Sequence, residues 1–373
     1  MDNEKKIALL DRNRKIIQVI LKEIEKKCPD SVDLIGITGS FCNGDYHEKS
    51  DLDLLIIRND SKAKVLDKCF IVDGVGFDIY TQDWERIEEL SNYPSPYVTK
   101  IFNLGIVYFR NQEVINRIKR IQGRLKENMQ NDDLVEDRIR LHFRNALEAY
   151  DYLEASNDLN DSYVYYSRII REIEAVVYFL NKTYIKQSTK NIPDDISKMG
   201  LLPGDFLEIY NTLVDCESKE EMIKKASDFI GVVQLYLDSF MIISEYQYEE
   251  KKPKAKKEIT KEVLRGTYEE LFSNYRNKLY HAVDIDSNYL SFMTLSAAQE
   301  FYNEITDCYN IPKIKLIEKY SPYDLKKNAK AFEESLELWK KLYEEYGLNV
   351  EEYSGVNSIT RLYFDEKSVI KLS

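Results

Sequence analysis

The first 110 residues combine one helical pattern with several short apolar runs. Residues 7–27 repeat apolar side chains at the spacing of one helical face, which predicts an amphipathic helix. Five short apolar runs have the length of strands, and a helical segment around residues 84–90 precedes the last of them. The runs cover residues 33–38, 52–57, 69–72, 76–80 and 105–109. Asp73-Gly74, between the third and fourth runs, predicts a hairpin turn.

These patterns predict an α/β (α+β) sheet domain over residues 1–112, followed by mostly α-helical domains. Helical spacing continues over residues 113–248 and predicts a helical bundle domain. The charged, proline-containing stretch 249–259 predicts a linker. Residues 260–373 are expected to be mainly helical, with a short irregular or extended tail at the end.

The composition is that of a globular chain, with 43% hydrophobic residues among 373. No apolar stretch approaches the roughly 20 residues that cross a bilayer, and the N-terminus lacks a signal-peptide pattern, so a cytoplasmic protein is expected. The five cysteines are scattered and contain no CxxC pair. That pattern argues against a disulfide framework and against a structural zinc site.

The net charge of −12 arises entirely within residues 126–250, where 25 Asp and Glu stand against 13 Lys and Arg. A field of this sign attracts cations and repels phosphodiester backbones. A small cationic substrate is therefore favoured over a nucleic acid, and no membrane partner is expected. The alternative interpretation is a solvated acidic helical surface without a binding role.

The most informative motif lies between residues 35 and 57. Gly39 and Ser40 end the first predicted strand, ten residues follow, and Asp51 and Asp53 open the next strand. Residues two apart on a strand share a face, so these carboxylates repel each other unless a cation neutralises them. Mg²⁺ suits such a pair. Glycine permits close backbone approach to a ligand, and the serine N–H and hydroxyl bind phosphate oxygens.

A third acid, Asp78, lies between Phe77 and Ile79 in an apolar run that we expect to form a neighbouring strand. There it can share the face of the acid pair. Its predicted role is either a further metal ligand or the base that accepts a proton from an attacking hydroxyl.

The Gly-Ser pair, the gap, the Asp-x-Asp and the later strand Asp resemble the nucleotidyltransferase domain of the DNA polymerase beta superfamily. The sheet domain followed by a helical bundle is similar to the antibiotic nucleotidyltransferases that modify kanamycin and streptomycin. This resemblance implies that Gly39 and Ser40 hold a nucleoside triphosphate. It implies that Asp51, Asp53 and Asp78 form the catalytic acids and the site of two Mg²⁺ ions. A hydroxyl would receive the nucleoside monophosphate, and pyrophosphate would be released.

Two further groups of residues are also candidates. Lys190, with Lys182 and Lys186, can reach the triphosphate, although lysines also commonly lie at solvated helix ends. Glu172 or Glu174 can replace Asp78 as the general base, although pairing with Arg168 or Arg171 along the same helix is the more ordinary role.

Two histidines are also candidates. Arg276 and His281 resemble the arginine and histidine signature of helical ribonuclease domains, and a helix-surface histidine is the simpler interpretation. His47, between the Gly-Ser pair and the acids, is placed to touch a nucleotide, although its loop position alone explains it.

The sequence thus predicts a transferase that moves a nucleoside monophosphate, AMP from ATP, onto a hydroxyl of a small, cationic, antibiotic-like acceptor. Two alternatives remain open. One is nucleotide transfer to a protein or RNA acceptor, as in toxin–antitoxin systems. The other is a nucleotide sensor that has lost turnover, against which the intact acids argue.

Overall fold

The described part of the chain comprises residues 3–44, 46–186, 188–240, 242 and 255–358 of a computed structural model. Its first part folds as the sequence predicts: all five expected strands and the N-terminal helix are confirmed. The helices here are α1 (Asn3–Lys27), α2 (Gly39–Asn43), α3 (Trp84–Leu90) and α4 (Thr99–Phe102). The strands are β1 (Val32–Ile37), β2 (Leu54–Arg58), β3 (Lys68–Val72), β4 (Val75–Ile79), β5 (Thr81–Asp83) and β6 (Gly105–Phe109).

The strands form two sheets. One has the order β5-β2-β1-β6, in which β1 is antiparallel to β2 and β6, and β2 is parallel to β5. The other has the order β4-β3-β7, where β7 (Glu352–Tyr353) comes from the far end of the described chain. The expectation that the strand with Asp78 neighbours the strand after the acid pair is wrong, because β4 pairs with β3 while β5 pairs with β2.

The predicted hairpin at Asp73-Gly74 is confirmed. Both turn residues have positive φ, 49° and 73°, as a type I′ turn requires. Across the hairpin the rings of Phe70 and Phe77 stack with centroids 5.5 Å apart. They belong to a buried cluster that also contains Ile20 of α1, so the amphipathic helix packs against the strands with its predicted apolar face.

Residues 112–239 form the predicted helical region. Its long helices begin at residues whose side chains accept hydrogen bonds from the first turn: Asn111, Asn131, Asp158 and Ser218. The helices are α5 (Gln112–Met129), α6 (Asp132–Ala155), α7 (Leu159–Leu180), α8 (Ile192–Ser197), α9 (Phe206–Tyr210) and α10 (Lys219–Ser239).

The region after the predicted linker is also helical, and residues 249–254 of that linker lie outside the described residues. The helices are α11 (Lys261–Leu264), α12 (Thr267–Leu271), α13 (Asn277–Asp284), α14 (Asn288–Thr306) and α15 (Leu325–Glu345). A π-helical turn, Phe272–Arg276, joins α12 to α13. The predicted tail contains β7, which pairs with β3 in parallel. The tail therefore contacts the strands of the N-terminal part of the chain.

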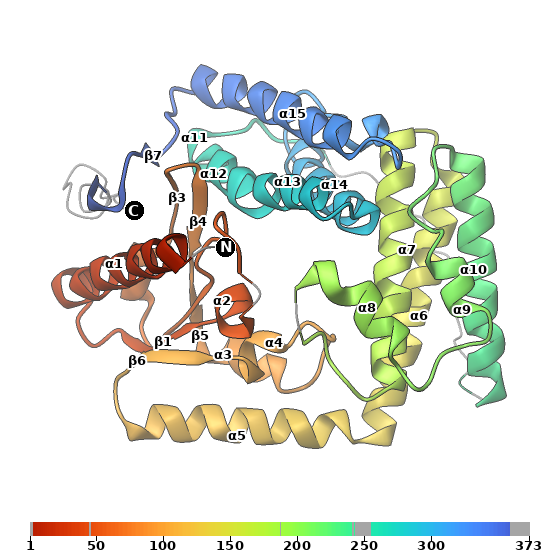
Figure 1. Cartoon of the computed structure of the whole chain (residues 1–373), viewed down its shortest axis with the longest axis horizontal. Helices are drawn as coiled ribbons and strands as arrows, with labels where there is room; N and C mark the ends of the chain where they lie inside the picture. The colour runs from red at the N-terminus through yellow and green to blue at the C-terminus, as the bar shows by residue number, and fades with distance from the viewer. Residues whose placement is uncertain (1–2, 45, 187, 241, 243–254, 359–373) are drawn as a thin grey trace.

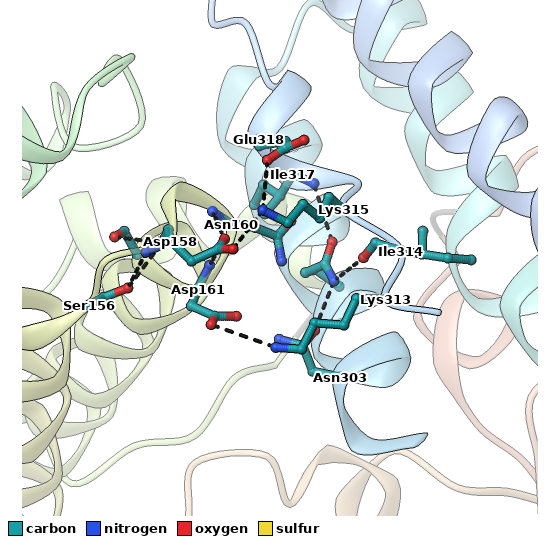
Figure 2. A network of polar contacts seen from close by, with 12 residues as sticks. Ser156, Asp158, Asn160, Asp161, Asn303, Lys313, Ile314, Lys315, Ile317 and Glu318 are labelled. Carbon is teal, nitrogen blue, oxygen red and sulfur yellow. Dashed lines mark hydrogen bonds and ion pairs between the residues drawn. The ribbon is translucent and has the colours of Figure 1, made fainter. Parts of the chain in front are cut away.

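Ion pairs connect the two helical regions, as Figure 2 shows at the start of α7. Lys315 Nζ lies 2.6 Å from Asp158 Oδ2, and Lys313 Nζ lies 3.9 Å from Asp161 Oδ2. Asp158 also accepts hydrogen bonds from the backbone N–H groups of Asn160 and Asp161. Exposed pairs of this kind contribute roughly 0–1 kcal/mol each to the free energy of unfolding. Their main effect is therefore on how the two helical regions are positioned.

Figure 1 shows the resulting arrangement: the strands with α1 and α2 lie on one side, and the upright helices α6, α7 and α10 lie on the other. Along one edge α5 joins the two groups, and along the opposite edge α12 to α15 do so. One buried apolar cluster extends from Leu34 in β1 to Leu348 after α15. The predicted order of a sheet region followed by helical regions is confirmed. No helix of the described chain is long and apolar enough to span a bilayer.

Candidate functional site

A pocket of about 420 Å³ lies where the sheet region, the segment after α7 and helix α13 meet. From the predicted site it contains Gly39, Ser40, Asp51, Asp53 and Lys190. Residues far apart in the sequence therefore converge on one surface. Further lining residues come from the C-terminal helical region: Ser273, Asn277, Lys278, His281 and Leu290.

The contact between Gly39 and Asp53 follows from strand register. Ile37 pairs with Leu54 across β1 and β2, and the Thr38 N–H donates to the Asp53 carbonyl at 2.9 Å. This pairing places Gly39 against the Asp53 side chain so closely that a Cβ on Gly39 would lie 1.8 Å from Asp53 Oδ2. Gly39 also has a φ of +62°, which side-chain-bearing residues rarely adopt. Glycine is required here for two independent reasons.

Asp51 and Asp53 lie just before β2 rather than within it, and both line the pocket. Asp51 is half-buried and Asp53 is exposed. Removal from water, followed by the charge of Asp53, raises the pKa of Asp51 to about 7. Although part of the Asp53 side chain is exposed, its carboxylate lies in the pocket against Gly39; the resulting removal from water raises the pKa of Asp53, and the charge of Lys278 opposes that rise. Two carboxylates in this state favour a cation between them.

Arg12 of α1 holds the segment that leads into the acid pair. Its Nη2 donates to the Ser50 carbonyl at 2.6 Å, and its guanidinium lies over the Phe77 ring at 5.1 Å. Burial lowers the pKa of Arg12 to about 10, and the charge of Asp51 opposes that shift. Arg12 was not identified from the sequence, where it is one of several cations on an amphipathic helix.

Asp78 on β4 lies near the acid pair, since its charge contributes to the raised pKa of Asp51. It is not among the residues that line the pocket. Burial, followed by the charge of Glu270, raises its own pKa to about 7. Within the described part of the chain, its buried Oδ1 has no hydrogen-bond partner. Such a carboxylate is well suited to accept a proton near neutral pH.

The carboxylates of this site are suited to Mg²⁺, which binds hard oxygen ligands and commonly takes only one or two protein carboxylates beside substrate phosphates. Asp51 and Asp53 supply such a pair, and both face the pocket. Among the described residues, no three His, Cys, Asp or Glu side chains are grouped so that they could hold one metal ion together. A metal-ligand role of Asp78 therefore stays a prediction.

Lys190 reaches the pocket because the chain after α7 is attached to the sheet region. The Ile185 N–H donates to the Pro96 carbonyl at 3.1 Å, and the Asn103 amide donates to the Lys186 carbonyl at 3.1 Å. Lys190 lines the pocket, whereas Lys182 pairs with Asp132 outside it.

The sequence that forms most of this site matches a known protein family. Residues 17–148 match the family described as "Nucleotidyltransferase domain". Residues 17–148 of this chain are thus similar to a nucleotidyltransferase domain. The match contains β1, α2, β2 and β4, and with them Gly39, Ser40 and the three acids. The predicted enzyme class is confirmed.

A search of curated proteins found no match. Among solved structures, a nucleotidyltransferase-like protein from Exiguobacterium sibiricum 255-15 aligns with 11% identity and a TM-score of 0.35. The alignment covers 58% of this chain and 74% of that chain.

The two glutamates on α7 have partners other than the arginines expected to hold them. Glu172 Oε2 lies 2.7 Å from His142 Nδ1. Glu174 is 2% exposed and accepts hydrogen bonds at Oε1 from the hydroxyls of Tyr210 and Tyr289, at 2.6 and 2.7 Å. Burial raises the pKa of Glu174 to about 7. The expected arginine partners are engaged elsewhere: Arg168 with Glu148, and Arg171 with Glu300.

His47 and His281 both line the pocket that contains Gly39 and Asp53, with ring centroids 4.5 Å apart and an interplanar angle of 20°. Burial, followed by the charge of His281, lowers the pKa of His47 to about 4. Arg276 does not line this pocket and pairs with Glu333 on α15 at 2.7 Å. The ribonuclease interpretation of Arg276 and His281 therefore has no support in this geometry.

A second pocket of about 640 Å³ adjoins the nucleotidyltransferase pocket and shares Lys190 and His281 with it. The tyrosines that hold Glu174 line it as well. Three of its lining residues are acids: Asp194, Asp215 and Asp286. The sequence placed excess negative charge in residues 126–250 without indicating which acids meet in a cavity.

Proposed function

We propose that this protein transfers a nucleoside monophosphate, AMP from ATP, to a hydroxyl of a small cationic acceptor such as an aminoglycoside. The observation that carries the proposal is the pair of adjoining pockets. The first contains Gly39, Ser40, Asp51 and Asp53, and the second contains three aspartates. A nucleotide in the first pocket and an acceptor in the second would meet beside Lys190 and His281.

In the proposed reaction, the acceptor oxygen forms a bond to the α-phosphorus and the bond from that phosphorus to the β-phosphate oxygen breaks, which releases pyrophosphate. Ser40 and Lys190 would bind the triphosphate, and Gly39 leaves the space for it. Asp51 and Asp53 would hold divalent metal ions. When bound, such ions stabilise the negative charge of the transferring phosphate.

We assign Asp78 as the base that takes the proton of the acceptor hydroxyl. Its pKa of about 7 and the unpartnered Oδ1 within the described structure support this role. Glu172 and Glu174 are less suited, because Glu172 faces His142 and Glu174 lies behind two tyrosine hydroxyls. The Asp78→Asn variant is expected to bind ATP normally and to lose most of its turnover.

The acidic second pocket supports a cationic acceptor. Opposite charges attract most strongly where water is partly excluded, and like charges repel a phosphodiester. The test combines Asp194→Asn with Asp215→Asn. We expect a higher KM for aminoglycosides and an unchanged affinity for ATP. A matched control combines Asp133→Asn with Asp228→Asn, two exposed acids that line neither pocket. Equal KM values in the two double variants would refute this acceptor site.

A further inference from the structure

One cation in the nucleotidyltransferase pocket comes from the C-terminal helical region. Lys278, on α13, lines the pocket together with Asp51 and Asp53. Its charge opposes the rise in the pKa of both of these acids and of Asp78. Lys278 is therefore close to all three carboxylates in space, although it is distant from them in the sequence.

The backbone of this helix is unusual where it meets the pocket. A π-helical turn, Phe272–Arg276, interrupts the helix and ends two residues before Lys278. Such turns occur mostly as single insertions and frequently at functional sites. Ser273 in this turn, and Asn277 and His281 in α13, lie four residues apart and line the same pocket as Lys278. One face of the helix is thus directed at the acids.

Contacts on both sides fix the position of this helix. A Cβ on Gly76 of β4 would lie 2.4 Å from Ser273 Cα, so the two backbones touch. On the loop before the acid pair, the Asn277 amide donates to the Lys49 carbonyl at 3.4 Å, and the His47 ring stacks on His281. Lys278 is therefore held at the acids by the fold, and the position does not depend on an ion pair with them.

The Lys278 ammonium is available to a ligand. The side chain is exposed within the pocket, and among the described residues no carboxylate forms an ion pair with it. Nearby acids attract it without binding it directly. An anion placed between Lys278 and metal-holding carboxylates would thus meet positive charge from both sides.

We propose that Lys278 is a catalytic residue whose ammonium binds the α-phosphate of the nucleotide beside Asp51 and Asp53. The inference rests on the proposed function, in which the acids hold metal at the phosphate that is transferred. Lys190 lines the same pocket from a different part of the chain, the segment after α7. In the proposal the two lysines contact different phosphates, Lys278 the α-phosphate beside the acids and Lys190 the β- and γ-phosphates.

The decisive comparison uses ligands with and without the α-phosphate. We would titrate AMP and adenosine, with Mg²⁺, into the wild type, Lys278→Met, Lys278→Arg and the control Lys326→Met, an exposed lysine on α15 that lines neither pocket. Lys278→Met should lose about tenfold or more in AMP affinity, because it removes a hydrogen bond between two charged groups. Its adenosine affinity should stay unchanged, and Lys278→Arg should recover part of the loss because it keeps the charge.

Turnover gives a second readout. Lys278→Met should lower the rate of nucleotide transfer by roughly 10²-fold at saturating ATP, while melting curves show a folded protein. An AMP affinity equal to that of Lys326→Met would overturn the proposal. So would an equal loss for AMP and adenosine, because that result would show a distorted pocket. If the wild type binds AMP through Lys278 but transfers nothing to any acceptor, the proposed function fails and the assignment of Lys278 to the α-phosphate stands.

Discussion

Gly39 shows how a single residue sets the geometry of the nucleotidyltransferase site. It combines a φ of +62° with a backbone that touches the Asp53 carboxylate. Gly39→Ala should therefore displace Asp53 and weaken ATP binding measured by calorimetry with Mg²⁺. Gly44→Ala is the matched control, because Gly44 also has a positive φ, +82°, but a Cβ there would meet no atom of the described chain within 4 Å. Equal ATP affinities in the two variants would show that the contact between residue 39 and Asp53 does not determine ATP binding.

The acid pair gives a prediction that separates activity from folding. Asp53→Asn removes one charge from the pocket and almost no volume. We expect a loss of turnover of roughly 10²-fold or more, since the metal ions would lose a charged ligand. The metal-free variant should melt at the same or a higher temperature than the wild type, because repulsion with Asp51 is removed. Pyrophosphate release and a melting curve test both parts, and near-normal turnover would exclude Asp53 from the metal site.

Glu174 gives a prediction about pH. The pKa of Glu174 is raised from 4.5 to about 7 in the folded state. Between pH 4.5 and 7, Glu174 is therefore protonated in the folded state and ionised in the unfolded state. The contribution of this group to the free energy of unfolding should therefore be greatest below pH 4.5 and fall as pH rises to 7, by at most about 3 kcal/mol. In Glu174→Gln this part of the slope should disappear. Urea unfolding at several pH values measures it, and identical slopes in both proteins would contradict the assigned pKa.

At the scale of elements, the contact between β4 and the π-helical turn holds the C-terminal helices against the sheet region. Gly76→Ala places a Cβ 2.4 Å from Ser273 Cα, and backbone cannot move aside as a flexible side chain can. We expect lower stability and lower turnover, because α13 and Lys278 would shift. Gly105→Ala is the strand control, since its Cβ would meet only an ordinary contact at 3.7 Å. If Gly76→Ala is as active as the control, the position of α13 does not matter for catalysis.

The elements also show what a local pattern can predict. Apolar runs and a turn dipeptide were sufficient for β1 to β4 and for the hairpin at Asp73-Gly74. They were insufficient for β5, whose Thr81-Gln82-Asp83 is polar and is defined by its parallel pairing with β2. The division into two sheets and the addition of β7 depend on pairing between distant segments, which periodicity within one segment does not contain.

At the scale of the whole molecule, the pocket is formed from three separated parts of the chain. That Asp51, Asp53 and the Gly-Ser pair lie together was predictable, because they are close in the sequence. Lys278 was not, although the stretch Arg276 to His281 that contains it resembles a different motif. Its role depends on the return of the C-terminal helices to the sheet region, a tertiary contact that no local spacing encodes.

Mass spectrometry of the acceptor tests most directly whether this protein transfers a nucleotide to a small cationic acceptor. Wild-type protein and Asp53→Asn would be incubated with ATP, Mg²⁺ and, separately, an aminoglycoside, a neutral lincosamide and a short RNA. We predict that the aminoglycoside gains the mass of one AMP, with equal pyrophosphate release, in the wild type only. An unmodified aminoglycoside together with nucleotide added to the RNA or the lincosamide would contradict a cationic acceptor.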